Sequence, residues 1–397
     1  MTCSALRLCL ASCFTAIVVD CQITTTFDDF IQIHGRQYAR DSDEYNMRRG
    51  IFDSNVASIE KHNRAKTSLW TRGVNKFADW TKQELSSLQG ERPYRPQSAK
   101  VLALTSLQHM GTSFPEHVDW SNLTSLKDIQ DQGGCGSCWA VSAMTTLRAH
   151  AEIWRGDSRK LSVQQLVSCM ENPDQCGGTG GCDGATAGLA LKYVLDNGIA
   201  YEDDFPYTAE EKPCPARFKR RSPSASFLVR GYGNGGDSTG GMSDFTVLPE
   251  NKMAPVMQAL YEYGPVKVSI AVPDDFISYA SGILDTCPKN AILTHGAVMI
   301  GYGEDKKLKS KYWRLQNSWG ENWGDGGRFK LLRRDIGYEE SEACGWDTEP
   351  EKGNGCIDGP AKIRVCGMCG LLSNVIVPKM IASGGMSQMM NARRLGQ

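Results

Sequence analysis

A cysteine suited to act as a nucleophile stands in the stretch Gln132-Gly-Gly-Cys-Gly-Ser-Cys-Trp139. Its three glycines predict a loop. Apolar side chains then recur at three- and four-residue steps from Val141 to Trp154, which predicts a largely buried helix. Cys138 would lie at the N-terminus of that helix, where unpaired amides and the positive end of the helix dipole favour a thiolate over a thiol. A thiolate at such a junction can attack a carbonyl carbon.

The same stretch also contains a Cys-x-x-Cys pair, which in other proteins is a redox centre or half of a zinc site. The only other such pair, Cys366-Gly-Met-Cys369, stands near the C-terminus, far beyond the spacing of a zinc ribbon. We therefore expect neither a metal site nor a cofactor.

A candidate base and a candidate orienting group follow in the second half of the chain. His150 lies twelve residues after Cys138 on the predicted helix, about 18 Å along its axis, and cannot reach the thiol. His295 lies in the apolar run 292–303, which predicts a strand, and Asn317 follows in a second predicted strand that ends in a glycine-rich turn. A lone histidine on an apolar strand is ordinarily a core residue. If the two strands pair as a hairpin, however, the Asn317 amide accepts from one imidazole nitrogen and leaves the other for the thiol.

Taken together, these motifs resemble the papain family of cysteine proteases, in its cathepsin L-like branch, for which Cys-Gly-Ser-Cys-Trp is a local signature. The resemblance implies that Cys138 attacks the peptide carbonyl, that His295 protonates the leaving amine and that Asn317 orients the ring. Gln132 matches the family's oxyanion-hole glutamine. Its side-chain amide and the Cys138 backbone amide would stabilise the developing oxyanion, by about 3–4 kcal/mol for each donor. Trp319 matches the tryptophan that shields the His–Asn hydrogen bond from water.

A second resemblance lies upstream, where polar and apolar residues share one helical stripe at steps of three and four. These residues are Glu44, Arg48, Phe52, Asn55, Ile59 and Asn63. They match the interspersed motif of cathepsin L-type propeptides, and Gly73-Val-Asn-Lys-Phe-Ala-Asp79 matches the motif that follows it. The resemblance, which covers about residues 27–378, implies a helical inhibitory pro-domain over 22–112 that lays an extended segment backwards through the active site. We expect protonation of carboxylates such as Asp79 to loosen it.

The first 21 residues predict a signal peptide, because Arg7 precedes an apolar run, Leu8–Val19, that is too short to span a membrane. A signal anchor is the alternative. No other run approaches twenty apolar residues, so we expect no stable membrane span after cleavage. The fifteen cysteines favour the endomembrane system, with the lysosome or vacuole or the extracellular space as destination.

The expected fold class is α+β, a papain-like catalytic domain over 113–378 that follows the pro-domain. It would have a helical half, 113–225, and a strand-rich, β-barrel-like half, 226–378, with the nucleophile on the first and the base on the second. Residues 90–112 predict an exposed linker for processing, and 379–397 a disordered tail.

The resemblance also implies disulfides. Cys135–Cys182 and Cys169–Cys214 would brace the helical half. The partner of Cys287 is ambiguous between Cys344 and Cys369; we favour Cys369, which stands before the better match to the family's closing strand. The remaining pairs would then be Cys344–Cys356, closing an insertion over 338–363 that has no counterpart in the family, and Cys176–Cys366.

Substrate contacts are less specific. Ala185 replaces the usual second glycine of Gly-Cys-x-Gly-Gly, and Thr294 replaces the usual Asn or Asp before the histidine. Small or apolar groups at the second subsite would favour an apolar residue before the cleaved one. No two histidines are adjacent, so we expect an endopeptidase rather than an exopeptidase. The expected substrate-binding residues are Gly136, Gly184, Ala185, Val266, Gly296 and Trp319.

The composition excludes a nucleic-acid footprint, since 44 basic and 45 acidic residues leave a formal net charge of −1. The expected partners are peptide or protein substrates and the chain's own pro-domain, and we expect a monomer. Asn122 begins the sequence's one glycosylation sequon. An inactive binding relative and an acyltransferase with a similar triad are the alternatives from other functional classes.

Overall fold

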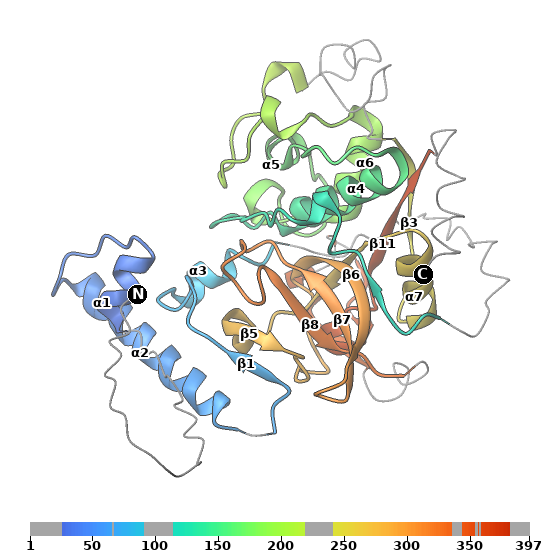
Figure 1. The fold of residues 1–397 in the computed structure, drawn as a ribbon. Helices are drawn as coiled ribbons and strands as arrows, with labels where there is room; N and C mark the ends of the chain where they lie inside the picture. The colour runs from blue at the N-terminus through green and yellow to red at the C-terminus, as the bar shows by residue number, and fades with distance from the viewer. Residues whose placement is uncertain are drawn as a thin grey trace, which may run out of the picture.

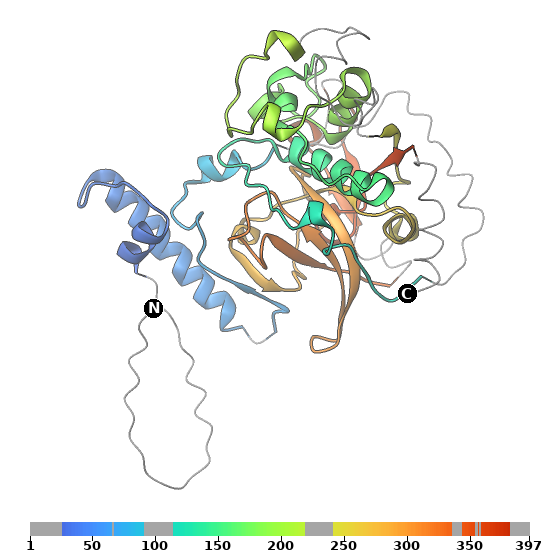
Figure 2. The same cartoon turned by 45° about the horizontal axis from the view of Figure 1, so that its top comes forward.

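The computed structural model describes residues 26–65, 67–90, 114–218, 241–335, 344–353, 356 and 359–381. Helices and a large sheet form the body, and α1 and α2 stand beside it, with α3 between α2 and the body (Figure 1). A rotated view keeps the same separation (Figure 2). The predicted signal peptide, nearly all of the linker and the chain beyond Ile381 lie outside the described residues.

The N-terminal part forms helices α1 (Phe27–Ile33), α2 (Asp43–Asn63) and α3 (Lys82–Ser86) and strand β1 (Trp70–Arg72). Each helix begins after a Ser or Thr whose side chain accepts from the backbone amide of the first turn, which satisfies a donor that the helix leaves open. The predicted stripe of α2 buries Phe52 and Ile59. Strand β1 pairs antiparallel with β5 (Tyr279–Gly282) and so attaches this part to the body.

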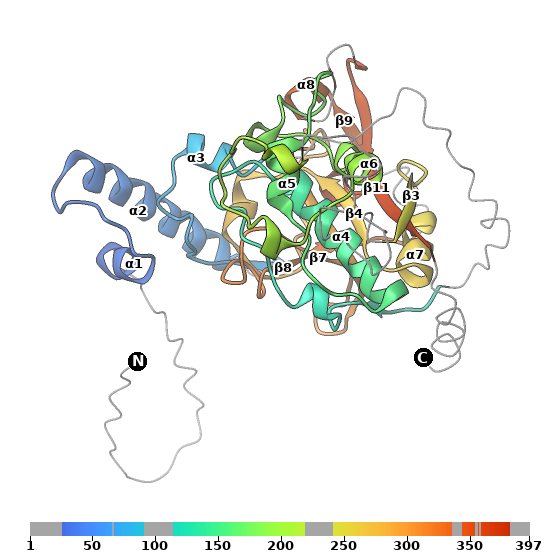
Figure 3. The same cartoon turned by 90° about the horizontal axis from the view of Figure 1, so that it is seen from above.

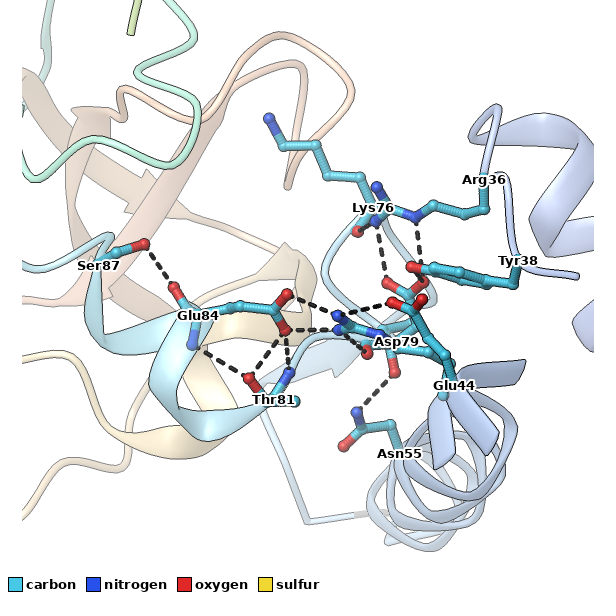
Figure 4. A network of polar contacts seen from close by, with 11 residues as sticks. Arg36, Tyr38, Glu44, Asn55, Lys76, Asp79, Thr81, Glu84 and Ser87 are labelled. Atoms are coloured by element: carbon cyan, nitrogen blue, oxygen red, sulfur yellow. Dashed lines mark hydrogen bonds and ion pairs between the residues drawn. The ribbon is translucent and has the colours of Figure 1, made fainter. Parts of the chain in front are cut away.

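A partly buried polar network joins α2 and α3 to the motif of residues 73–79 (Figure 4). The Asp79 side chain is fully buried and accepts from Arg36 Nε at 3.0 Å, Arg36 Nη2 at 2.9 Å and Tyr38 Oη at 2.8 Å. Arg48 donates to the Asp79 carbonyl at 3.0 Å and to both oxygens of Glu84. The two sequence motifs therefore form one scaffold that positions the end of α3.

The helical half contains α4 (Cys138–Arg155), α5 (Val163–Cys169) and α6 (Ala187–Asn197). The predicted helix over 138–154 is confirmed, and it ends at Gly156, whose φ of 73° is the left-handed conformation of a helix C-cap. Thirteen of its eighteen residues are buried, because one face packs on α5 and α6 and another on the sheet strand β6.

The strand-rich half is a seven-stranded sheet with the order β3-β11-β4-β6-β7-β8, to which β2 adds by pairing with β6. Its helix α7 (Met253–Glu262) packs on β4 and β6. The strands are β2 (Val118–Asp119), β3 (Met242–Val247), β4 (Val266–Ile270), β6 (His295–Asp305), β7 (Ser310–Gln316), β8 (Arg328–Leu332) and β11 (Val375–Met380).

The expected β-barrel-like closure is wrong, because the sheet stays open between β3 and β8. A barrel needs hydrogen bonds between its two edge strands. Here Phe245 and Val247 of β3 pack against the core of the helical half, away from β8. We expected a disordered tail from Lys379 onward, and this boundary is wrong. Lys379 and Met380 still belong to β11 and pair with β3.

The inserted segment folds as a hairpin of β9 (Cys344–Asp347) and β10 (Ile363–Cys366) with the short helix α8 (Pro350–Gly353) between them. Figure 3 shows α8 and β9 together at one edge of the molecule. The hairpin register places Cys344 opposite Cys366, and these two form a disulfide, whereas Cys356 bonds Cys176 of the helical half. Both pairings that we expected for these four cysteines are therefore wrong.

The other bridges are Cys135–Cys182, Cys169–Cys214 and Cys287–Cys369, the pairs that the resemblance implied. In the part of the chain that the structure describes, no helix is both long and apolar enough to cross a membrane.

Candidate active site

Cys138 is the first residue of α4 and is fully buried. It belongs to none of the five disulfides of the described residues. The preceding residue, Ser137, makes no side-chain cap on the helix; its hydroxyl instead pairs with Tyr207 Oη at 2.5 Å. The Ser137 carbonyl accepts from Ala140 N at 2.9 Å and from Val141 N at 3.0 Å, and the positive end of the helix dipole at this end of α4 favours negative charge at the sulfur.

His295 and Asn317 lie side by side because β6 and β7 form the predicted antiparallel hairpin. His295 is the first residue of β6, Asn317 directly follows β7, and Nε2 is 2.7 Å from Asn317 Oδ1. An amide oxygen only accepts hydrogen bonds, so Nε2 carries the proton and Nδ1 is the basic nitrogen. The ring of Trp319, which is fully buried, is tilted by 40° against the imidazole with the ring centroids 4.8 Å apart, in the position of a shield against water.

Burial lowers the pKa of His295 to about 4, because the charged imidazolium loses its hydration, and the hydrogen bond with Asn317 opposes that shift. In this form of the protein the ring is therefore neutral at neutral pH. The neighbouring Leu88 backbone also raises the pKa, whereas the charge of Lys267 lowers it.

Gln132 is buried and held at both ends of its amide. Nε2 donates to the Cys135 carbonyl at 2.8 Å and to the Leu88 carbonyl at 3.1 Å, and Oε1 accepts from Ser318 Oγ at 2.6 Å. This arrangement directs the amide protons toward a carbonyl oxygen next to Cys138. We did not predict a role for Ser318; its position directly after Asn317 is the sequence signal that could have indicated one.

The last described residues of the N-terminal part pass directly over these groups. Gly90 N donates to Cys138 Sγ at 3.4 Å, and the Gly90 carbonyl accepts from Ala185 N at 3.1 Å. On the opposite wall, Thr294 Oγ1 donates to Gln89 Oε1 at 2.8 Å. The main chain of residues 88–90 therefore contacts the candidate nucleophile, the candidate oxyanion donor and one wall of the site, and the Gln89 side chain contacts the other wall.

Three glycines allow this close approach. A Cβ on Gly90 would lie 1.7 Å from the Gly136 carbonyl oxygen, and a Cβ on Gly184 would lie 2.9 Å from the Gly90 carbonyl oxygen. Gly136 and Gly184, both expected to bind substrate, thus border the path of residues 88–90.

The structure does not place Val266 beside the other residues that we expected to bind substrate. Its side chain is buried in the core cluster with Val268 and Ile270, and its cross-strand partner is Met299. Gly296 pairs instead with Ser269, on the face of β4 that is opposite to Val266.

That face carries Lys267, which is fully buried and donates to Ser269 Oγ at 2.6 Å. The run 265–272 predicts a strand without showing which alternate residues lie on the face of Gly296, so the position of Lys267 was not predicted.

Comparisons with family models and with known proteins identify the same family. Residues 114–352 match the papain family cysteine protease model, and residues 27–85 match the cathepsin propeptide inhibitor domain. The senescence-specific cysteine protease SAG39 of Oryza sativa subsp. japonica is 31% identical over 350 residues, which cover 86% of this chain and 94% of that relative. Cathepsin S of Mus musculus is 29% identical over 318 residues, which cover 79% of this chain and 86% of that relative.

Among solved structures, a digestive procathepsin L 3 of Tenebrio molitor larval midgut is 25% identical, with a TM-score of 0.66 over 89% of this chain and 98% of that one. A recombinant stem bromelain precursor shares the fold with a TM-score of 0.64 at 24% identity, over 90% and 98% of the two chains. The chain therefore belongs to the papain family of cysteine proteases and carries the propeptide inhibitor domain of a zymogen.

Proposed function

We propose that the protein is a cysteine endopeptidase that is made as an autoinhibited zymogen and cleaves peptide bonds through Cys138 and His295. The observation that carries this proposal is the position of residues 88–90 in the candidate active site. One short segment of the propeptide contacts Cys138 Sγ through Gly90 N and the Gln132 amide through the Leu88 carbonyl. Inhibition by occupation of the site requires contacts of this kind.

The chemistry follows from the positions of the four side chains. The Cys138 thiolate attacks the substrate carbonyl carbon, and the resulting oxyanion accepts from the Gln132 amide and the Cys138 backbone amide. The His295 imidazolium gives its proton to the leaving amine, which departs and leaves a thioester on Cys138. Neutral His295 then takes a proton from water, the resulting hydroxide attacks the thioester, and the acid product leaves, which restores the Cys138 thiolate and the His295 imidazolium. Asn317 keeps the ring oriented throughout.

Internal peptide bonds are the proposed target, since the sequence has no adjacent histidine pair to bind a chain terminus. The proposed location is the endomembrane system, in the lysosome or vacuole or outside the cell, and the five disulfides support an oxidising compartment. We propose a monomer whose partners are peptide substrates and its own propeptide. The apolar preference that we expected at the second subsite depended partly on Val266, which is buried in the core on the face of β4 opposite to Gly296.

Acid activation of the purified precursor, followed by an epoxide label specific for cysteine proteases, tests the proposal. Mass spectrometry should show loss of the propeptide and one label on Cys138. The Cys138→Ser precursor, incubated in parallel, should neither shorten nor take up label.

Shortening of the Cys138→Ser precursor would indicate a contaminating protease. If the wild-type enzyme, freed of its propeptide by an added protease, took up no label and cleaved no peptide, the proposed activity would be wrong. Products in which the acyl group is joined to an added amine rather than to water would identify an acyltransferase instead.

A further inference from the structure

A tyrosine outside the catalytic set joins the two ends of the glycine loop that precedes α4. Tyr207 Oη donates to the Gln132 carbonyl at 2.9 Å and pairs with Ser137 Oγ at 2.5 Å. A phenol has only one proton, so Ser137 supplies the proton of the second bond. One hydroxyl therefore bridges the residue that begins the loop and the residue that directly precedes Cys138.

The two bridged residues carry the two proposed oxyanion donors. Gln132 contributes its side-chain amide, and the peptide unit that joins Ser137 to Cys138 contributes the Cys138 N–H. The distance between these donors depends on the loop 133–136, in which three of the four residues are glycines. Such a backbone has many accessible conformations, so contacts from outside the loop are needed to hold one of them. The Tyr207 hydroxyl provides a contact of this kind at both ends.

Tyr207 is itself held by the helical half. Its backbone amide donates to Glu202 Oε1 at 2.8 Å, and the amide of the next residue, Thr208, donates to Gln164 Oε1 of α5 at 2.9 Å. Its ring packs at the margin of the hydrophobic core of this half. The phenol therefore reaches the loop from a separately anchored segment.

Other contacts restrain one part of the loop each. The Cys135–Cys182 disulfide fixes its middle. Ser318 holds Gln132 from the strand-rich half, since its carbonyl accepts from Gln132 N at 2.8 Å and its hydroxyl donates to Gln132 Oε1 at 2.6 Å. The Tyr207 hydroxyl instead fixes one end of the loop relative to the other.

The phenol keeps its proton at neutral and acid pH. Burial is the main cause that raises the pKa of Tyr207 to about 12; the Ser137 hydrogen bond lowers this pKa, and negative charge at Cys138 raises it. The bond to the Gln132 carbonyl is therefore present throughout the pH range of an acid or neutral protease.

We propose that Tyr207 is a positioning residue of the reaction, whose hydroxyl fixes the two oxyanion donors relative to each other and to the Cys138 sulfur. The inference rests on the protease function proposed above. Because the hydroxyl bonds the loop rather than the reacting atoms, its effect on the rate passes through the Gln132 amide and the Cys138 N–H. A small displacement of these donors reduces stabilisation of the transition state more than it reduces substrate binding.

Tyr207→Phe tests the proposal, since it removes the hydroxyl and keeps the ring. All precursors are freed of the propeptide by the same added protease, and kcat and KM are measured with one peptide substrate. We expect kcat to fall by about 10-fold, which is less than the roughly 10²- to 10³-fold loss for a missing oxyanion donor. KM should stay within about 2-fold of the wild-type value.

Alkylation of Cys138 by iodoacetamide separates positioning from damage to the fold, because it needs the thiolate but forms no oxyanion. Its rate and the pH dependence of that rate should be the same in Tyr207→Phe and in wild type. Tyr193→Phe is the matched control on the same half. It removes a hydroxyl that accepts from Gln165 Nε2 at 3.3 Å, and it should leave kcat unchanged.

A double-mutant cycle with Gln132→Ala shows whether the effect passes through the oxyanion donors. One positioned donor is already absent in Gln132→Ala, so the addition of Tyr207→Phe should lower kcat by less than it does in wild type. Fully additive losses would show that Tyr207 acts elsewhere. If Tyr207→Phe fails to fold, Ser137→Ala takes its place, because it removes one of the two contacts and keeps the phenol; kcat should again fall while the alkylation rate does not.

The proposal is overturned by an unchanged kcat in the variant that folds, by additive losses in the cycle, or by a kcat that falls only as much as the alkylation rate. Each of these results would make Tyr207 a structural residue of an active protease. A wild-type enzyme that neither cleaves peptides nor takes up the epoxide label is a different result, which would overturn the protease function and this inference with it.

Discussion

The Gln132 side-chain amide donates a 3.1 Å hydrogen bond to the carbonyl oxygen of Leu88, so a propeptide carbonyl occupies the donor that we assign to the oxyanion. The same amide is fixed from behind by Ser318. Catalysis and inhibition therefore use one group, and a change in that group should alter both.

Gln132→Ala should lower kcat by about 10²- to 10³-fold, because one preorganised oxyanion donor is lost. It should also weaken the propeptide's hold on the enzyme. Kinetics with a fixed peptide substrate measure the first effect, and the pH of self-processing measures the second. Gln130→Ala, in the neighbouring half-exposed glutamine, is the control. An unchanged kcat in Gln132→Ala would remove this residue from the mechanism.

Gly90→Ala should release the inhibition. The added methyl group would lie 1.7 Å from the Gly136 carbonyl oxygen, which is backbone and cannot move aside without moving the nucleophile loop. Overpacking of this kind costs about 1–3 kcal/mol, so inhibition should weaken about 5- to 150-fold.

The measurement is the label uptake of the uncut Gly90→Ala precursor at neutral pH. Gly50→Ala on α2, where an added Cβ meets nothing within 4 Å, should behave as wild type. A Gly90→Ala precursor that stays unlabelled would show that residues 88–90 do not inhibit through this close contact.

Acid should favour release of the propeptide through His295. In the closed form burial lowers its pKa from the ordinary 6.5 to about 4, whereas a ring returned to water regains the ordinary value. The open form therefore binds more protons between pH 6.5 and pH 4, so the closed form loses stability as pH falls through that window, by up to about 3 kcal/mol. Below pH 4 this contribution no longer changes.

Hydrogen exchange in the peptide that contains Leu88 to Gly90, followed against pH in the Cys138→Ser precursor, measures this release without self-cleavage. A second variant, Cys138→Ser with His295→Asn, should lose the transition between pH 6.5 and 4. If both precursors open at the same pH, His295 does not control the release.

Asp79→Asn should weaken the propeptide scaffold, because the buried carboxylate is the shared acceptor of Arg36 and Tyr38. Hydrogen bonds to a charged group contribute about 2 kcal/mol, and asparagine replaces only part of them. The variant precursor should process itself at a higher pH than wild type. Asp53→Asn, which changes an exposed i,i+4 pair of α2, is the control. An unchanged processing pH would show that the Asp79 carboxylate does not stabilise the propeptide on the enzyme.

Local motifs were sufficient to predict the parts of the site that depend on neighbours in sequence. The glycine loop and the periodic segment after it predict Cys138 at a helix start, and two adjacent strands predict His295 beside Asn317. The propeptide motifs likewise predict a helix that holds Asp79.

Other features depend on how distant segments meet, which one sequence does not determine. Val266 and Lys267 are adjacent in an apolar strand, and only the pairing with β6 shows that Lys267 shares the face of Gly296. The pairing of Cys344 with Cys366 follows from the register of β9 and β10. Whether the sheet closes depends on β3, which packs on the helical half.

The Cys176–Cys356 bridge joins the half that contains Cys138 to the half that contains His295. A single cut at any bond between these two cysteines therefore leaves both fragments covalently attached. Between Cys182 and His295, such a cut would produce a two-chain enzyme with its nucleophile on one chain and its base on the other. That species would migrate as one molecule in a gel until a reductant separates it.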